Sequence, residues 1–410
     1  MVELLADRKE AAIVRPLSDL AHLIAPIDIP TFEREYWEKK SLLIQRNDPD
    51  YYSQLLTLQD VDRILSLSSV RSDGLRVVLD GKETPISDLV SGGEIGGTNA
   101  LERLYEKYRS GSTVVLNSLQ QRWEPLQRLT QALGAQVSAR FAVNVYVTPA
   151  GNQGFAPHYD IHDVFIAQVH GSKRWRLHGA QEQLPLKDNP FDRSQSVRDD
   201  PDQEFDLNRG DLLYLPRGTV HSAMANDTVS VHLTIGVHPV VWATVLEEAI
   251  KEVFAAEVAF RRGLPMGFLA SSAMQREVEA RFAELTGLLS SRLSASEMRS
   301  AAVKRAASIS HPTLSGHLLD LEKLGEITVA TEVRLRRGVR FSHSRTESGV
   351  QLDFHNKTVQ LPARVTDEVE FILGTTGEFF AGNDIPGNLD ESGRVVLIRV
   401  LVREGLLSLV

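Results

Sequence analysis

A block of short apolar runs between residues 137 and 239 constrains the fold of this chain of 410 residues more than any other feature. The runs are separated by Gly, Pro, Asn and Asp, and they read ARFAVNVYVTP, DVFIAQVHG, KRWRLHG, GDLLYLP and VSVHLTIGV. Short strands at such spacing are typical of antiparallel sandwiches and barrels. The block therefore predicts a jelly-roll domain. Because helical patterns flank it, we expect a chain of the α+β class.

After residue 240 the apolar pattern takes the period of a helix. One apolar helix face is predicted from the positions of Leu246, Ile250, Val253, Phe254 and Val258. Helical patterning continues to about residue 307, and RRGLPMG interrupts it. Four apolar residues at the interruption fit either a core or a subunit contact, and these are Leu264, Met266, Phe268 and Leu269.

A boundary is expected near residue 310, at ISHPTLSGHLL. Beyond it the sequence predicts a helix, the basic strand EVRLRRGVRF, the strand VQLDFHNKTVQL and the helix RVTDEVEFILG. The tail predicts a helix that opens near Asp390 and closes at Gly405, followed by a short strand. Helices with a two-stranded wing in a segment of this length indicate a small winged-helix domain.

Charge and cysteine content narrow the function classes. The formal net charge is −9, which disfavours non-specific coating of nucleic acid. No cysteine is present, so disulfides, thiolate zinc sites and cysteine nucleophiles are excluded, and a reducing cytoplasm fits. The first residues, MVELLADRKEAAIVRP, are acidic where a signal peptide is basic, and no apolar run approaches the roughly 18 residues of a membrane helix. We therefore expect a cytoplasmic protein with no membrane partner.

The stretch GFAPHYDIHDVF carries a candidate metal site. If it is a strand, His158 and Asp160 face the same side and offer a nitrogen and an oxygen to one point. Two histidines and one carboxylate with open positions are the ligand set of non-heme Fe(II) oxygenases. The third ligand is predicted to be His221, because GDLLYLPRGTVHSA turns after a strand and brings this histidine back. His162 could replace a ligand or lie behind one, whereas the adjacent His162 and Asp163 as a pair face opposite ways and fit pocket or surface positions.

Such an iron site needs an electron donor, and 2-oxoglutarate would need a cation for its far carboxylate. Lys173 shares a strand face with Trp175, whereas Arg174 and Arg176 take the other face, so Lys173 is the predicted inward base. On the strand before it, Asn144 and Tyr146 also share one face, and both can bond a carboxylate.

These segments, together with YWEKKSLLIQR, resemble the JmjC-type ribosomal oxygenases, a cupin-like family of bacterial, nuclear and nucleolar protein hydroxylases. The resemblance covers nearly the whole chain. It implies a double-stranded β-helix (JmjC) catalytic domain over residues 1–240 with an N-terminal helical extension, a helical dimerisation domain over 241–310, and a winged-helix domain over 311–410. It therefore implies a homodimer.

The resemblance also implies roles for single residues. The iron ligands would be His158, Asp160 and His221. The residues that bind 2-oxoglutarate would be Lys173, Tyr146, Asn144, Thr234 and His232. Fe(II), 2-oxoglutarate and dioxygen would together hydroxylate an unactivated C–H bond, in the relatives at a β-carbon of Arg or His in a ribosomal protein. His162 departs from the more acidic run expected after the ligand aspartate.

Three alternatives remain at this stage. The same chemistry could act on a peptide precursor of a natural product or on a small metabolite. A non-catalytic protein could instead bind nucleic acid through RLRRGVRF, although many acids surround that strand. Lysine demethylation uses a similar site and is a minor option.

Overall fold

The computed structural model describes residues 19–410 except 68–73, 80, 90–97, 193–196, 198–199, 270–271, 310–313 and 356. The chain forms two compact units, Met1–Val137 with Phe141–His238, and Ser138–Arg140 with Pro239–Val410. We call them the sandwich unit and the second unit. The predicted boundary near residue 310 lies outside the described residues.

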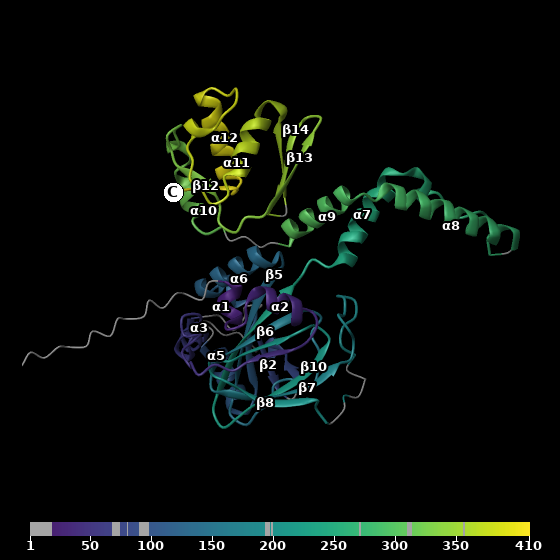
Figure 1. Cartoon of the computed structure of the whole chain (residues 1–410). Helices are drawn as coiled ribbons and strands as arrows, with labels where there is room; N and C mark the ends of the chain where they lie inside the picture. Colours follow the sequence, from purple (N-terminus) through teal and green to yellow (C-terminus); the bar gives the residue numbers. More distant parts are fainter. Residues whose placement is uncertain are drawn as a thin grey trace, which may run out of the picture. The chain divides into compact units, whose positions relative to one another are not determined.

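The sandwich unit is built from two antiparallel sheets that face each other (Figure 1). The large sheet has the order β1-β9-β6-β11-β5-β4-β2-β3, and the small sheet has the order β10-β7-β8. The large sheet consists of β1 (Leu42–Ile44), β2 (Leu75–Leu79), β3 (Lys82–Thr84), β4 (Thr113–Leu116), β5 (Arg140–Thr148), β6 (Asp163–His170), β9 (Leu212–Leu215) and β11 (Ser230–His238). The small sheet consists of β7 (Ser172–Ala180), β8 (Gln203–Asn208) and β10 (Thr219–Ala225). The predicted mixed fold with a β-sandwich is confirmed.

An apolar core holds the two sheets together. Apolar side chains of β6 and β9 in the large sheet pack against β7 and β8 in the small one, and they are Val164, Ile166, Leu213, Leu215, Trp175, Leu177 and Leu207. Burial alternates along β7 because one face meets this core and the other meets solvent. Seven of the eight residues of β6 are buried, which fits a strand covered on both faces.

Short helices accompany the sandwich, and they are α1 (Leu20–Ile24), α2 (Ile29–Glu35), α3 (Leu58–Leu67), α4 (Ile86–Leu89), α5 (Thr98–Arg109) and α6 (Glu124–Val137). The backbone N–H of Leu20 donates to the Gln136 side chain at 2.8 Å and ties α1 to α6. Phe32 of α2 packs with Phe165 and Tyr214 of the large sheet, with ring centroids 5.7 and 4.9 Å away.

The second unit begins with the helices α7 (Trp242–Ala256), α8 (Ser272–Arg292) and α9 (Ala295–Ser308). The break predicted at RRGLPMG is confirmed, since α7 ends before it and α8 starts after it. The predicted apolar face of α7 is wrong in part, because its buried side chains are Val245, Ala249 and Val253. Of these, Val245 and Ala249 pack on Ala301 of α9, and the small alanines allow that close approach.

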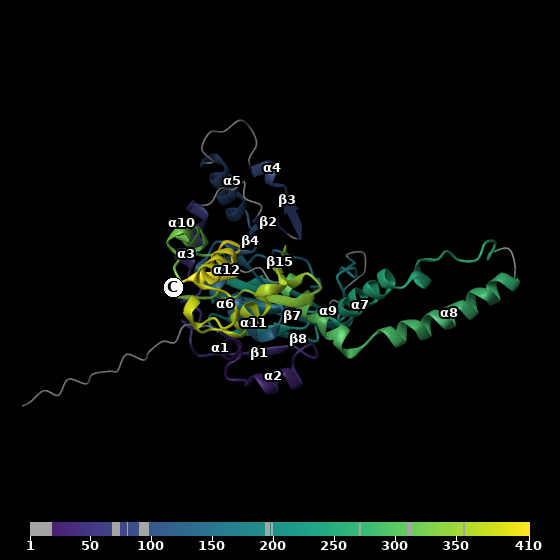
Figure 2. The same ribbon diagram turned by 90° about the horizontal axis from the view of Figure 1, so that it is seen from above.

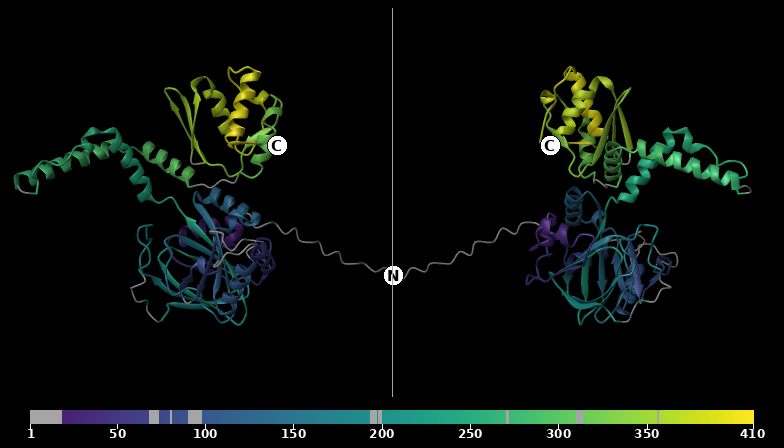
Figure 3. Two further views of the ribbon diagram at one scale, coloured as in Figure 1. Left: turned by 180° about the vertical axis from the view of Figure 1, so that it is seen from behind. Right: turned by 45° about the vertical axis from the view of Figure 1, so that its right-hand side comes forward.

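Most of the remaining residues of the predicted face stay exposed. Leu246 and Phe254 of α7 and Val258, which follows the helix, are 40%, 40% and 56% exposed, whereas Ile250 is half-buried. No residue of α8 is buried, and Figures 2 and 3 show this long helix reaching out from α7 and α9. None of the described helices is long and apolar enough to cross a membrane.

The C-terminal part of the second unit has its own apolar core, in which Val350, Val369, Ile398 and Leu401 are fully buried. Its helices are α10 (His317–Glu322), α11 (Thr366–Gly374) and α12 (Glu391–Arg403). Two strands pair as β12 (Val333–Leu335) and β16 (Leu407–Leu409). Three more form the sheet β13 (Phe341–Thr346), β14 (Gly349–Phe354) and β15 (Lys357–Pro362).

The expected helix after Asp390 is confirmed, with Asp390 as its N-cap and Gly405 in the left-handed region beyond its end. The expected two-stranded wing is wrong, because a third strand, β15, pairs with β14. In the basic segment, Arg336 is buried and binds Asp320 and backbone carbonyl groups. This arginine is therefore structural and offers no charge to nucleic acid.

Candidate metal centre and its pocket

His158, Asp160 and His221 come together as predicted, but their local structure differs from the expectation. His158 and Asp160 lie in an irregular extended segment before β6, not in a strand. A single bridge joins this segment to β10, in which the His158 N–H donates to the His221 carbonyl at 3.1 Å and the His221 N–H donates back at 2.8 Å. This bridge places the two histidines side by side.

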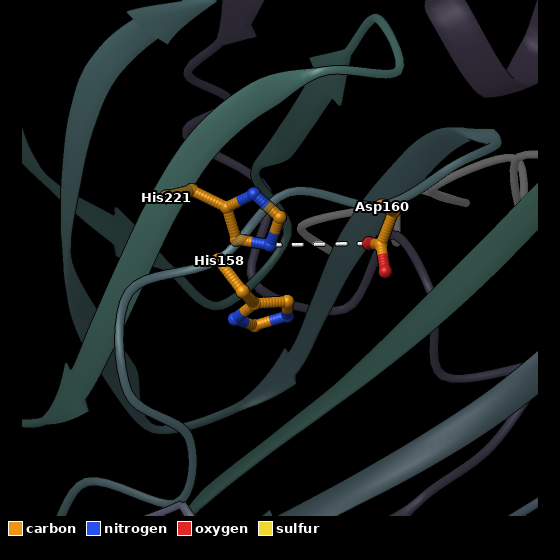
Figure 4. A group of neighbouring side chains, drawn as sticks. All are labelled: His158, Asp160 and His221. Carbon is orange, nitrogen blue, oxygen red and sulfur yellow. Dashed lines mark ion pairs between the residues drawn. The ribbon is translucent and has the colours of Figure 1, made fainter. Parts of the chain in front are cut away.

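The three side chains form a compact ligand cluster (Figure 4). One ligand atom from each lies within 4.8 Å of the others, and His221 Nε2 is 3.9 Å from a carboxylate oxygen of Asp160. Each histidine has its other ring nitrogen fixed: Nδ1 of His158 donates to the Ala156 carbonyl at 2.8 Å, and Nδ1 of His221 donates to the Thr219 carbonyl at 3.0 Å. Both Nε2 lone pairs are thereby left for a metal, which is the usual arrangement of histidine ligands.

The protonation states also suit a metal. Burial lowers the pKa of His221 to about 4, and the neighbouring His158 adds to this effect, so the ring is neutral near pH 7. Burial by itself would raise the pKa of Asp160, but electrostatic interaction with His162, His221 and His158 outweighs burial and holds that pKa below its usual value. Neutral imidazoles and an ionised carboxylate are the forms that bind metal ions.

A buried ion pair fixes the turn that carries His221. Asp163 is fully buried and accepts the Arg217 backbone N–H at 2.9 Å and its guanidinium at 3.1 Å. The prediction that Asp163 is a pocket or surface residue is therefore wrong. In the same turn Gly218 has φ of +86°, and an added Cβ would lie 1.8 Å from the Glu182 carbonyl oxygen, so only glycine fits.

The pocket beside the cluster holds about 530 Å³, its mouth included. Lys173 lines it and is only 4% exposed, whereas Arg174 and Arg176 point outward to Asp206 and Glu204. The predicted strand parity is therefore correct. Burial lowers the pKa of Lys173 to about 7, and within the described residues its ammonium has no hydrogen bond or ion pair. A buried ammonium group without a partner is stabilised by a bound anion.

Three of the four other predicted pocket residues line this space: Tyr146, His232 and Thr234. His232 is 3% exposed and stacks on Tyr146, with ring centroids 4.8 Å apart and planes 3° apart. Its Nδ1 is buried without a hydrogen-bond partner. Asn144 is not among the lining residues, because its side-chain oxygen accepts the Ser118 N–H at 2.9 Å.

Sequence reasoning missed several lining residues. Thr113 comes from β4 and Phe155 from the segment before His158, and no local pattern marks either. Ser222 also lines the pocket although it follows a ligand directly. A register shift in β10 between Thr219 and His221 breaks simple alternation there.

Comparison with known proteins agrees with this geometry. Residues 118–245 match the JmjC domain family, so the chain contains a JmjC domain. Mouse Ribosomal oxygenase 2 is 33% identical over an alignment of 269 residues that covers 62% of this chain and 56% of the mouse protein. Chicken Ribosomal oxygenase 1 is 28% identical over 94% of this chain and 71% of its own length. The chain thus spans little more than half of the mouse relative.

A solved structure shares the fold. It is the Escherichia coli ribosomal oxygenase YcfD in complex with cobalt and 2-oxoglutarate, with a TM-score of 0.51 and 15% identity, over 94% of this chain and 98% of that one. The resemblance that the sequence motifs indicated is confirmed by these matches.

Proposed function

We propose that this JmjC-domain protein, which resembles ribosomal oxygenases, is an Fe(II)- and 2-oxoglutarate-dependent oxygenase that hydroxylates an unactivated C–H bond of a protein side chain. One observation carries the proposal: a cluster of two histidines and one aspartate faces the same pocket as a buried, unpaired lysine. When bound, the iron and 2-oxoglutarate supply oxidative decarboxylation that drives hydroxylation by dioxygen.

The donor set fits iron. Nitrogen from His158 and His221 and oxygen from Asp160 make the two-histidine, one-carboxylate set that leaves coordination positions open. The fixed Nδ1 hydrogen bonds hold both rings in place before a metal arrives. The name of the Escherichia coli structure includes cobalt, which prefers similar ligands, so this comparison supports a divalent transition metal here.

The other end of the pocket fits the co-substrate. Lys173 would bind the far carboxylate of 2-oxoglutarate by a charge-assisted hydrogen bond. The Tyr146 hydroxyl, the free Nδ1 of His232 and the Thr234 hydroxyl are further groups that can bond this acid. Asn144 would act indirectly by positioning Tyr146, since its side chain lies beside the tyrosine hydroxyl. Val164, Ile166 and Trp175 line the same space and would exclude water from it.

A ribosomal protein is the substrate we propose, on a histidine or arginine side chain. Both named relatives are ribosomal oxygenases, and a net charge of −9 suits a basic protein partner. Among the described residues of the pocket, none favours a peptide precursor of a natural product or a small metabolite over a protein side chain. A chain with no cysteine fits a cytoplasmic location, which we propose as well.

We further propose a homodimer formed by the helices α7–α9, with a winged-helix domain at the C-terminus. Large apolar side chains cluster in this helical region with high exposure, and they are Trp242 77%, Leu264 61%, Met266 96%, Leu269 82% and Phe282 70%. Exposed apolar surface on this scale is typical of a subunit contact. Pairing with a second copy would bury it.

The test is turnover of 2-oxoglutarate to succinate by the purified protein with Fe(II), measured by NMR. We expect His158→Ala and Asp160→Ala to abolish it, because each removes a metal ligand. His343→Ala is the matched control, since this exposed histidine lies in β13 of the second unit. Unchanged turnover in both ligand variants would contradict the metal assignment, and no turnover in the wild type would contradict the function.

A further inference from the structure

A short segment after α2 lies against the strand that leads to the metal centre. That strand, β9, is followed by a turn at residues 216–218 and then by β10, which carries His221. The Trp37 ring stacks on Tyr214 of β9, with ring centroids 6.2 Å apart and planes 15° apart. The Glu38 backbone N–H donates to the Tyr214 hydroxyl at 2.9 Å. Tyr214 is fully buried, so these contacts hold the segment firmly on β9.

The backbone of Glu38 has an uncommon conformation. Its φ is +57°, in the left-handed region that is disfavoured for a residue with a Cβ. Such a conformation persists only where the surroundings hold it, and it is frequent at functional sites. The Glu38 carboxylate accepts a hydrogen bond from Nη1 of Arg217, in the turn after β9. The N-terminal extension therefore reaches the turn through one charged side chain.

The Arg217 guanidinium lies between two carboxylates. Its Nη1 binds both Glu38 and Asp163, the second at 3.1 Å. The Arg217 side chain is 6% exposed and Asp163 is 0% exposed, whereas Glu38 is 31% exposed. A buried cation needs charged partners in fixed places. Because a single nitrogen serves both carboxylates, the place of the guanidinium depends on Glu38 as well as on Asp163.

The turn is also tied to the segment that carries the other ligands. The Arg217 N–H donates to Asp163 at 2.9 Å. The Gly218 N–H donates to the backbone carbonyl of Asp160 itself at 3.0 Å. His221 follows three residues after Gly218. One turn thus connects the backbone of Asp160 to that of His221, and a displacement of this turn would change the distance between two metal ligands.

We propose that Glu38 is a positioning residue of the metal centre, which acts through Arg217 on the turn before His221 and strengthens metal binding without contacting the metal. This inference rests on the proposed function and gives the N-terminal extension a part in its metal site. Residues that support metal ligands typically change metal affinity 10- to 100-fold when they are lost, and Glu38 acts through a further residue, so we expect an effect of about tenfold.

The experiment measures binding of Co(II) to the metal-free protein by visible absorption, which reports both the affinity and the coordination of the ion. Glu38→Gln removes the charge and keeps the size of the side chain. We expect it to raise the Kd of Co(II) about tenfold and to alter the absorption bands. Glu38→Asp keeps the charge and should retain more of the affinity. Thermal melts of the metal-free proteins establish that each variant is folded during the titration.

Glu33→Gln is the matched control. Glu33 lies in α2 of the same extension, is exposed, and loses the same charge in this variant. It should bind Co(II) with the affinity and the spectrum of the wild type. A merely structural role of Glu38 would lower the thermal midpoint and leave the Kd and the spectrum of the folded protein unchanged.

A double-mutant cycle tests the path of the effect. Tyr214→Phe removes the hydroxyl that accepts the Glu38 N–H and keeps a ring against Trp37. Alone it should raise the Kd of Co(II), because it releases Glu38. Added to Glu38→Gln it should cause little further loss, since both changes act through the same contact. Fully additive losses would overturn this path.

The outcomes separate this inference from the proposed function. No Co(II) binding by the wild type contradicts the metal site and, with it, the proposed function. Binding by the wild type that Glu38→Gln equals in affinity and spectrum overturns the positioning role and leaves the proposed function intact. An equal loss in Glu33→Gln would overturn it too, because the effect would then come from net charge alone.

Discussion

Lys173→Met should weaken 2-oxoglutarate binding and at the same time stabilise the empty protein. The ammonium lies in a pocket with 4% of the residue exposed, and burial lowers its pKa from 10.5 to about 7. A tenfold change in proton affinity corresponds to about 1.4 kcal/mol, so burying this charge costs up to about 5 kcal/mol. A bound carboxylate offsets that cost by a charge-assisted hydrogen bond of about 1.5–3 kcal/mol.

Losing that bond should raise the Kd of 2-oxoglutarate about ten- to a hundred-fold. Calorimetry without oxygen, with Fe(II) bound, measures this directly. Methionine fills a similar volume without a charge, so the thermal midpoint of the empty variant should rise at pH 7. The unfolded state binds more protons than the folded state between pH 7 and 10.5, so the gain from methionine is complete below pH 7 and fades toward pH 10.5.

Arg174→Met is the matched control, because this neighbour on β7 points outward to Asp206 and Glu204. It should leave the Kd of 2-oxoglutarate unchanged. If Lys173→Met bound the acid as tightly as the wild type, or if Arg174→Met produced the loss, the assignment of the pocket's anion site would be refuted.

Three further outcomes are expected. The affinity for 2-oxoglutarate should be highest below pH 7 and fall above it, because Lys173 loses its proton in the empty pocket above pH 7, whereas the complex retains it. Calorimetry across pH 6–9 checks this, and an affinity that does not change with pH would contradict it. Leu246→Glu with Phe254→Glu should convert the dimer to a monomer by placing charges on the exposed apolar face, which light scattering detects; a monomeric wild type would disprove the contact. Gly218→Ala should lower the free energy of unfolding by more than about 1 kcal/mol and weaken metal binding, because its Cβ would lie 1.8 Å from a carbonyl oxygen. Gly263→Ala, with open space around it, is the control and should change neither. Thermal melts with and without metal measure both variants.

The sequence was sufficient for the metal cluster because the geometry it needed is local. His158 and Asp160 share a side through extended backbone, which holds although the segment is irregular and not a strand. His221 followed from a Pro-containing turn between two strands, although β9 ends at Leu215 and β10 starts at Thr219, two residues before His221, which was expected to open the strand.

The wall of the pocket could not be predicted in the same way. Thr113 lies on β4, and it reaches the site only through the pairing of β4 with β5. Such long-range pairing has no signature in a single sequence.

The spacing of apolar residues alone also predicted the wrong buried face for part of α7. The apolar residues of this helix span two stripes, and the stripe of small residues, with Val245 and Ala249, packs on α9. The stripe with Leu246 and Phe254 stays exposed in one chain. A helical pattern reports which residues are apolar, but it does not report which of two partners each stripe will meet.

The central claim is tested most directly by comparing the proteome of a deletion strain with that of its parent by mass spectrometry. The account predicts at least one peptide, from a ribosomal protein, that carries one added oxygen in the parent and none in the deletion strain. Restoring the gene should restore the oxygen, and restoring it with Asp160→Ala should not. Identical oxidation in both strains, or rescue by the Asp160→Ala gene, would contradict the account.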